Sequence, residues 1–186
     1  MVRLIPLKKQ PYNNSITMQE FVILVDEHNN EIGLMEKLEA HQKALLHRAF
    51  SIFIINSKGE LLLQQRALNK YHSGGLWTNS CCSHPRANEQ TIDAAHRRLK
   101  EEMGFDCELT EKFSFLYKAQ FENGLTEHEL DFIFVGEFND KPNINPEEVN
   151  DYAWMTIDDV LSDLKQFPNK YTEWFKIILN QYVSHL

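Results

Sequence analysis

The sequence lacks long apolar runs, an excess of positive charge and a paired-cysteine pattern. No run of about 18 apolar residues occurs, and the opening MVRLIPLKKQPYNNS has no apolar segment typical of a secretory signal. The formal net charge of −8 argues against general nucleic-acid binding. The cysteines number three, two of them adjacent, which suggests reduced thiols and no disulfide framework. We therefore expect a cytoplasmic protein with neither a membrane nor a nucleic-acid partner.

The composition is that of an ordinary globular protein. Hydrophobic residues make up 42% of the 186 residues and charged residues 25%, enough apolar material for one sizeable core. Residues 1–18 carry Pro, Asn and Lys without hydrophobic periodicity, so we expect an N-terminal arm there. Residues 19–186 contain no internal repeat or low-complexity tract, which predicts a single catalytic or binding domain.

Hydrophobic periodicity predicts a mixture of strands and helices. Two short linkers, Ser57-Lys58-Gly59 and Glu122-Asn123-Gly124, are typical of hairpin turns. Helices are predicted at 92–104, 156–165 and 171–183. Strands are predicted at 20–26, 48–56, 60–66, 112–121, 126–138 and 151–157. This order favours an α+β layered fold, with a mixed β-sheet flanked by helices, over a doubly wound parallel fold.

Acidic residues alternate along one predicted strand, TEHELDF. Glu127, Glu129 and Asp131 share one face of it because side chains alternate across a strand. The apolar residues that follow indicate a buried central strand. Buried carboxylates need a partner or a metal ion, whereas a hydrated sheet edge would need neither. Both interpretations remain open from this strand alone.

Histidines at three places could supply the missing partners. His41 and His47 bracket a short segment before an apolar strand, and His84 follows the cysteine pair. Three imidazoles and two carboxylates would suit a divalent ion such as Mn²⁺, Zn²⁺ or Mg²⁺, with the borderline metals favoured by the nitrogen ligands. The spacing is not diagnostic, because each histidine taken alone is more often structural. The set matters only if the fold brings its members together.

The segment TNSCCSHPR places Cys81 and Cys82 just before His84. It has three interpretations: a metal-binding corner, half of a disulfide, or a catalytic thiol beside a metal ligand. Further along, RRLKEEMGF at 97–105 is typical of a salt-bridged surface helix, and it also resembles the second half of the Nudix box. Two positions depart from that box, Ser83 in place of glycine and Arg98 in place of glutamate. These departures argue against ordinary diphosphate hydrolysis while keeping a Nudix-like fold.

Four segments together resemble type 1 isopentenyl-diphosphate Δ-isomerases, a family with the Nudix fold. They are GLWTNSCCSHP, RRLKEEMG, ENGLTEHELD and NPEEVNDYAWM, and the resemblance runs from about residue 20 to Trp174. The family moves a double bond between isopentenyl and dimethylallyl diphosphate in isoprenoid biosynthesis. The resemblance thus implies an isomerase with a small-molecule diphosphate substrate.

The resemblance also implies roles for individual residues. Cys82 and Glu129 match the family's acid–base pair, and Tyr117 matches the tyrosine that assists the carboxylate. Glu102 matches the residue that holds Mg²⁺ against the diphosphate. A second divalent metal (Mn²⁺, Zn²⁺ or Mg²⁺) would be held by His41, His47, His84, Glu127 and Glu129. The substrate contacts would be Lys37, Arg66, Lys70, Arg98 and Trp174.

Other polar residues near these motifs receive no functional role. We expect His72 and His96 to be surface residues, Cys81 and Cys107 to be structural, and Glu148 to lie in a turn. Alternative functions are a Nudix hydrolase and a non-catalytic metal-binding module. A redox thiol protein is disfavoured because no Cys-x-x-Cys spacing occurs. We expect a monomer or a weak oligomer.

Overall fold

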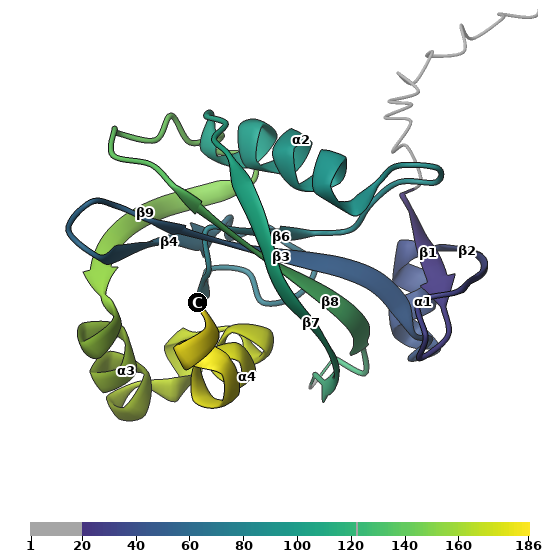
Figure 1. Ribbon diagram of the computed structural model, residues 1–186. Helices are drawn as coiled ribbons and strands as arrows, with labels where there is room; N and C mark the ends of the chain where they lie inside the picture. The colour runs from purple at the N-terminus through teal and green to yellow at the C-terminus, as the bar shows by residue number, and fades with distance from the viewer. Residues whose placement is uncertain (1–19, 122) are drawn as a thin grey trace, which may run out of the picture.

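The computed structural model describes residues 20–121 and 123–186. The arm expected at residues 1–18, and Glu122 of one expected turn, lie outside this described part. Within it, a single mixed sheet carries helices on both faces (Figure 1). None of these helices is long and apolar enough to cross a membrane.

The sheet is built around one long apolar strand, β3. The path through hydrogen-bonded neighbours runs β2 (Glu31–Glu36), β1 (Phe21–Val25), β3 (His47–Ile55), β4 (Glu60–Arg66) and β5 (Trp77–Thr78). Four strands join beside this path, namely β6 (Cys81–Ser83), β7 (Leu109–Gln120), β8 (Thr126–Glu137) and β9 (Val149–Thr156). β8 lies parallel to β3, whereas the other pairings are antiparallel. The predicted mixed sheet is confirmed.

Helices cover the two faces of this sheet. The helices are α1 (Lys37–Gln42), α2 (Thr91–Met103), α3 (Ile157–Gln166) and α4 (Glu173–Tyr182), with short 3₁₀ turns at Pro168–Lys170 and Val183–His185. α2 lies over one face, and α3 and α4 lie over the other (Figure 1). α1 and the β1–β2 hairpin sit at one end of β3 and β8. The α+β layered architecture expected from the sequence is therefore present.

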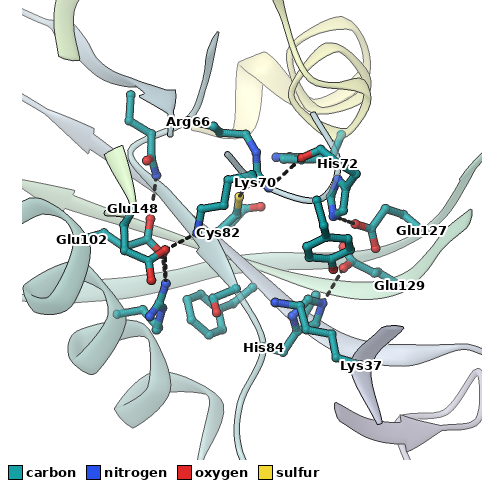
Figure 2. A pocket seen from close by; sticks show the side chains of 18 of the residues that line it. Lys37, Arg66, Lys70, His72, Cys82, His84, Glu102, Glu127, Glu129 and Glu148 are labelled. Carbon is teal, nitrogen blue, oxygen red and sulfur yellow. Dashed lines mark hydrogen bonds and ion pairs between the residues drawn. The ribbon is translucent and has the colours of Figure 1, made fainter. Parts of the chain in front are cut away.

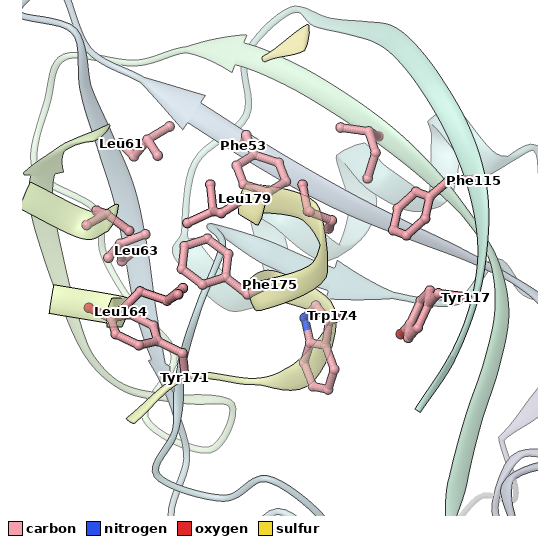
Figure 3. Packing of buried hydrophobic residues seen from close by; sticks show 13 residues of the cluster. Phe53, Leu61, Leu63, Phe115, Tyr117, Leu164, Tyr171, Trp174, Phe175 and Leu179 are labelled. Atoms are coloured by element: carbon pink, nitrogen blue, oxygen red, sulfur yellow. The ribbon is translucent and has the colours of Figure 1, made fainter. Parts of the chain in front are cut away.

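Alternation along β3 divides the core into two parts. Phe53 packs with Phe175 and the other buried residues of α3 and α4 (Figure 3). Ile52 and Ile54 face the opposite side, where they pack with Leu99 of α2. Since successive side chains of a strand point to opposite faces, β3 anchors both helical layers through its second half, residues 52–55, which is apolar on both faces. This packing holds α2, which carries most of the RRLKEEMG segment, against β3 and β6.

α2 ends where its sequence predicts. Gly104 adopts a left-handed conformation (φ 75°), and its N–H bonds to the carbonyl of Lys100. A Cβ at this position would lie 2.2 Å from the carbonyl oxygen of Asn143. Glycine is therefore required here both by backbone conformation and by close packing.

Most predicted strands and helices are found within a few residues of their expected bounds. The elements that sequence patterns missed are short: β2, α1, β5 and β6. Each has six residues or fewer, and none carries a continuous apolar run like the FVILV of β1. The hydrated-edge interpretation of TEHELDF is wrong, because β8 lies between β3 and β7 and Glu127, Glu129 and Asp131 are buried.

Candidate active site

A pocket opens where the ends of β3, β4, β6 and β8 meet α1 and the loop before β5 (Figure 2). It encloses about 620 Å³ when the space open to solvent is included. Most residues assigned from the family resemblance line it: Lys37, Arg66, Lys70, Cys82, His84, Arg98, Glu102, Tyr117, Glu127, Glu129 and Trp174. His41 and His47 are buried beside it, in contact with Glu127 and Glu129.

The three histidines and two glutamates form one compact cluster. Each offers a donor atom, and these atoms all lie within 4.8 Å of one another; the residues are His41, His47, His84, Glu127 and Glu129. Strand register creates this proximity, since His47 on β3 is the parallel partner of Glu129 on β8. α1 brings in His41, and the end of β6 brings in His84.

Backbone carbonyls orient two of these imidazoles. Nδ1 of His41 lies 2.5 Å from the carbonyl of Lys37, and Nδ1 of His47 lies 2.8 Å from that of Leu45. Such contacts fix the tautomer that leaves the Nε2 lone pair free for a metal. Both Nε2 atoms are buried and have no hydrogen-bond partner among the described residues. Orphaned buried nitrogens that face carboxylates are what a divalent metal site requires, so the donor set fits such an ion.

The pKa values of the two glutamates in the cluster shift in opposite directions. Burial, reinforced by the charge of Glu129, raises the pKa of Glu127. Burial would also raise the pKa of Glu129, but the neighbouring imidazoles of His47 and His84 hold it well below its usual value. Burial lowers the pKa of His84 to about 3, against the opposing effect of Glu129. A neutral His84 beside an ionised Glu129 is the protonation pattern of metal ligands.

Cys82 faces the pocket, whereas Cys81 points into the core behind it. The two are adjacent on β6, so their side chains leave opposite faces of the strand. Burial raises the pKa of the Cys82 thiol to about 12, although the nearby Arg66 guanidinium opposes the shift. Nη1 of Arg66 lies 4.0 Å from the sulfur. Cys82 is therefore a thiol at neutral pH.

Glu129 is also held from the side away from the histidines. The Tyr117 hydroxyl donates to its Oε2 across 2.5 Å, while Oε1 lies 2.8 Å from Nε2 of His84. Two residues further along the same face of β8, Asp131 accepts a hydrogen bond of 2.9 Å from Ser51. Burial raises the pKa of Asp131 well above its usual value. Strand alternation predicts Asp131 on this face but indicates no role for it.

Two of the pocket's cationic side chains, Lys70 and Arg98, pair with Glu148 and Glu102, whereas Lys37 lies on the side of His84 (Figure 2). Arg98 contacts Oε1 of Glu102 at 2.6 Å and Oε2 of Glu148 at 3.1 Å. Lys70 also pairs with Glu148. Glu148 does lie in a turn, as expected, but its side chain enters the pocket and joins two cations, which sequence patterns did not predict. Arg66 stacks over Trp174 with its Cζ 5.3 Å from the ring centroid.

His72 is not a surface residue. Only 8% of it is exposed, and its Nε2 lies 3.2 Å from Oε1 of Glu127. Burial, followed by the Arg66 charge, lowers its pKa to about 2. The prediction failed because a single histidine in a glycine-containing loop carries no periodic signal. His96, in contrast, is a partly exposed partner of Asp106, as expected.

Comparisons with known proteins identify the family of this chain. The NUDIX domain family model matches residues 45–175. Isopentenyl-diphosphate Delta-isomerase 2 of Aromatoleum aromaticum is 50% identical over 90% of this chain and 88% of its own length. The protein of the same name from Photorhabdus laumondii is 53% identical over 88% of this chain and 92% of its own.

Solved structures of low sequence identity share the fold. A protein from Deinococcus radiodurans superposes with a TM-score of 0.72 at 17% identity, covering 88% of this chain and 99% of its own. A MutT protein from Methanosarcina mazei gives a TM-score of 0.62 at 16% identity, covering 75% and 94%. From its fold and its relatives, the chain belongs to the isopentenyl-diphosphate Delta-isomerase family within the NUDIX domain family.

Proposed function

We propose that this chain interconverts isopentenyl and dimethylallyl diphosphate, with Cys82 and Glu129 as its acid–base pair. One observation carries the assignment of residues. The two side chains come from β6 and β8, strands that flank β3 on either side, and they face one pocket that four cationic side chains also line. A substrate whose diphosphate lies among those cations would extend its hydrocarbon between the thiol and the carboxylate.

The reaction needs one proton donor and one proton acceptor. A proton is added to the terminal alkene carbon, leaving a tertiary cation at the branched carbon. Loss of a proton from the allylic carbon then forms the new double bond. One member of the Cys82–Glu129 pair donates and the other accepts, and the roles exchange when the reaction runs in reverse. An unactivated alkene is a weak base, so the donor must be held close to it in a site that excludes water.

Neighbouring residues would support both the pair and the cation. Tyr117 holds Glu129 through its hydroxyl. The face of Trp174, which already stacks with Arg66, can stabilise a developing cation by about 1–2 kcal/mol or more in a dry pocket. A divalent ion, Mn²⁺, Zn²⁺ or Mg²⁺, bound by the three histidines with Glu127 and Glu129 would supply positive charge that orients the Glu129 carboxylate.

The diphosphate group would be bound but not cleaved. Lys37, Arg66, Lys70 and Arg98 are the cations of the pocket wall. Glu102, just 5% exposed, would hold Mg²⁺ against the phosphate oxygens. Its own oxygens contact Arg98 and Gln64, at 2.6 and 2.9 Å. An Mg²⁺ ion at Glu102 would share this carboxylate with Arg98 and Gln64.

The contact between Arg98 and Glu102 argues against a Nudix hydrolase. Arg98 stands where the Nudix box has a glutamate, and its guanidinium neutralises part of the carboxylate set that would otherwise gather metal ions for phosphate chemistry. The pocket also contains a thiol, which hydrolysis does not need. A non-catalytic metal-binding module would have no use for Cys82 opposite Glu129.

The direct test supplies purified protein with isopentenyl diphosphate and Mg²⁺, with Mn²⁺ or Zn²⁺ added in parallel. Dimethylallyl diphosphate, which is acid-labile, and released phosphate or pyrophosphate are measured in the same samples. We expect the allylic product without phosphate release. Phosphate release without isomerisation would favour the hydrolase. Absence of both products with every metal would favour the binding module.

We also infer a cytoplasmic location, a single domain and a low oligomeric state. Cys81, Cys82 and Cys107 are free thiols, which suits the reducing cytoplasm. The described residues form one sheet and its covering helices, consistent with a single catalytic domain over residues 19–186. We infer a monomer or a weak oligomer that binds neither membranes nor nucleic acid. Sedimentation equilibrium over a range of concentrations would measure the oligomeric state.

A further inference from the structure

His72 approaches the metal-binding cluster from outside it. The mutually close donor atoms found among the described residues do not include a nitrogen of His72. Its Nε2 nevertheless lies 3.2 Å from Oε1 of Glu127, on the pocket side of that carboxylate (Figure 2). The ring therefore contacts a candidate ligand without being one itself.

The two oxygens of Glu127 face different partners. Oε2 lies 2.7 Å from Nε2 of His41 and 3.9 Å from Nε2 of His47, and it has no hydrogen-bond partner among the described residues. Oε1 faces His72 instead. Oε2 is therefore directed toward the cluster, whereas Oε1 can accept a hydrogen bond from an N–H donor. A carboxylate so held cannot rotate freely away from the cluster.

The His72 ring is itself held in place. It stacks on Phe121 with the ring centroids 5.2 Å apart and meets Trp174 edge-on at 6.1 Å. Nδ1 lies 3.3 Å from the Ser73 hydroxyl, which can donate to it. In that tautomer the hydrogen of the neutral ring sits on Nε2, facing Glu127. The backbone is also fixed, because Nη2 of Arg66 donates to the His72 carbonyl across 3.3 Å.

We propose that His72 is a positioning residue that holds Oε1 of Glu127 and thereby keeps Oε2 aimed into the metal centre. The inference rests on the proposed metal site at His41, His47, His84, Glu127 and Glu129. Groups that orient metal ligands in this way typically contribute 10–100-fold to metal affinity. The aromatic contacts of His72 suggest a rival role as a wall of the pocket, and the two roles need different atoms.

Two substitutions separate these roles. His72→Phe keeps an aromatic ring against Phe121 and Trp174 but removes the nitrogen that faces Glu127. His72→Gln keeps an N–H donor at about the same reach but removes the ring. His96→Phe is the matched control, because His96 is a partly exposed histidine paired with Asp106, away from the pocket. Each protein is stripped with a chelator and titrated with Mn²⁺ alone, using calorimetry or the electron paramagnetic resonance signal of free Mn²⁺.

We expect His72→Phe to weaken Mn²⁺ binding by about 10–100-fold, with His72→Gln and His96→Phe both remaining near the unsubstituted protein. Thermal unfolding of the stripped proteins checks that each variant is folded. Unchanged affinity in His72→Phe would overturn the inference, as would a loss seen only in His72→Gln, which would assign the effect to ring packing. If the unsubstituted protein binds none of Mn²⁺, Zn²⁺ and Mg²⁺, the proposed metal site itself is wrong. The role of His72, which depends on that site, is then wrong as well.

Discussion

Tyr117 and Glu129 are cross-strand partners on β7 and β8, and the tyrosine hydroxyl donates to Oε2 of the carboxylate across 2.5 Å. A hydrogen bond to a charged group contributes about 1.5–3 kcal/mol. Because this one holds the proposed acid–base group and not the diphosphate, we expect Tyr117→Phe to lower kcat by roughly 10–100-fold with little change in KM. Steady-state kinetics measure both. Tyr182→Phe, another partly buried tyrosine of the same core, is the control; an equal loss there would point to packing.

Replacing the pocket thiol should stop turnover without emptying the metal site. Cys82→Ala removes one of the two acid–base groups, for which we expect a loss of at least 10²–10⁴-fold in kcat. Cys81→Val changes the adjacent residue, whose side chain is fully buried on the other face of β6, and should leave kcat near its original value. Turnover assays and metal content are measured together. Near-normal turnover in Cys82→Ala would refute its assignment to the acid–base pair.

The thiol state of Cys82 should be visible in its pH dependence. Burial raises its pKa to about 12, so the protonated form persists well above the ordinary thiol range near pH 9. Only the thiolate is alkylated, and a raised pKa therefore lowers the labelling rate at any given pH. We expect iodoacetamide labelling of Cys82, followed by peptide mass spectrometry, to be slow at pH 8. The rate should still rise tenfold per unit of pH at pH 9. A plateau below pH 9 would contradict this thiol state.

Lys70 offers a test of the diphosphate end. Lys70→Met retains the aliphatic stem and removes a charge that lines the pocket beside Glu148. Loss of a charged contact of about 1.5–3 kcal/mol predicts a rise in KM of roughly 10–100-fold, larger than any fall in kcat. Lys100→Met, an exposed lysine on α2, is the matched control. If kcat fell while KM stayed constant, Lys70 would belong with the reacting groups and not with the diphosphate.

Local patterns predicted the long strands, α2 and the face of β8 that carries Glu127 and Glu129. The same patterns could not place His41 or His72. His41 sits in α1, which is too short for a hydrophobic period, and it reaches the cluster because α1 packs against β8 and the β1–β2 hairpin. His72 is set by its loop and by aromatic neighbours distant in sequence, such as Phe121 and Trp174. The His72–Glu127 and Glu148–Arg98 contacts are tertiary in origin, so no window along the chain contains both partners.

The pairing of β3 with β8 also limits when the site can exist during synthesis. His47 emerges from the ribosome early and Glu129 late, and the parallel register that joins them cannot form until β8 has been made. Pairing over so long a loop is entropically costly and slow. A nascent chain would therefore leave these histidines without their acidic partners until most of the sheet is complete. Metal uptake would then mark the closing stage of folding rather than help to start it.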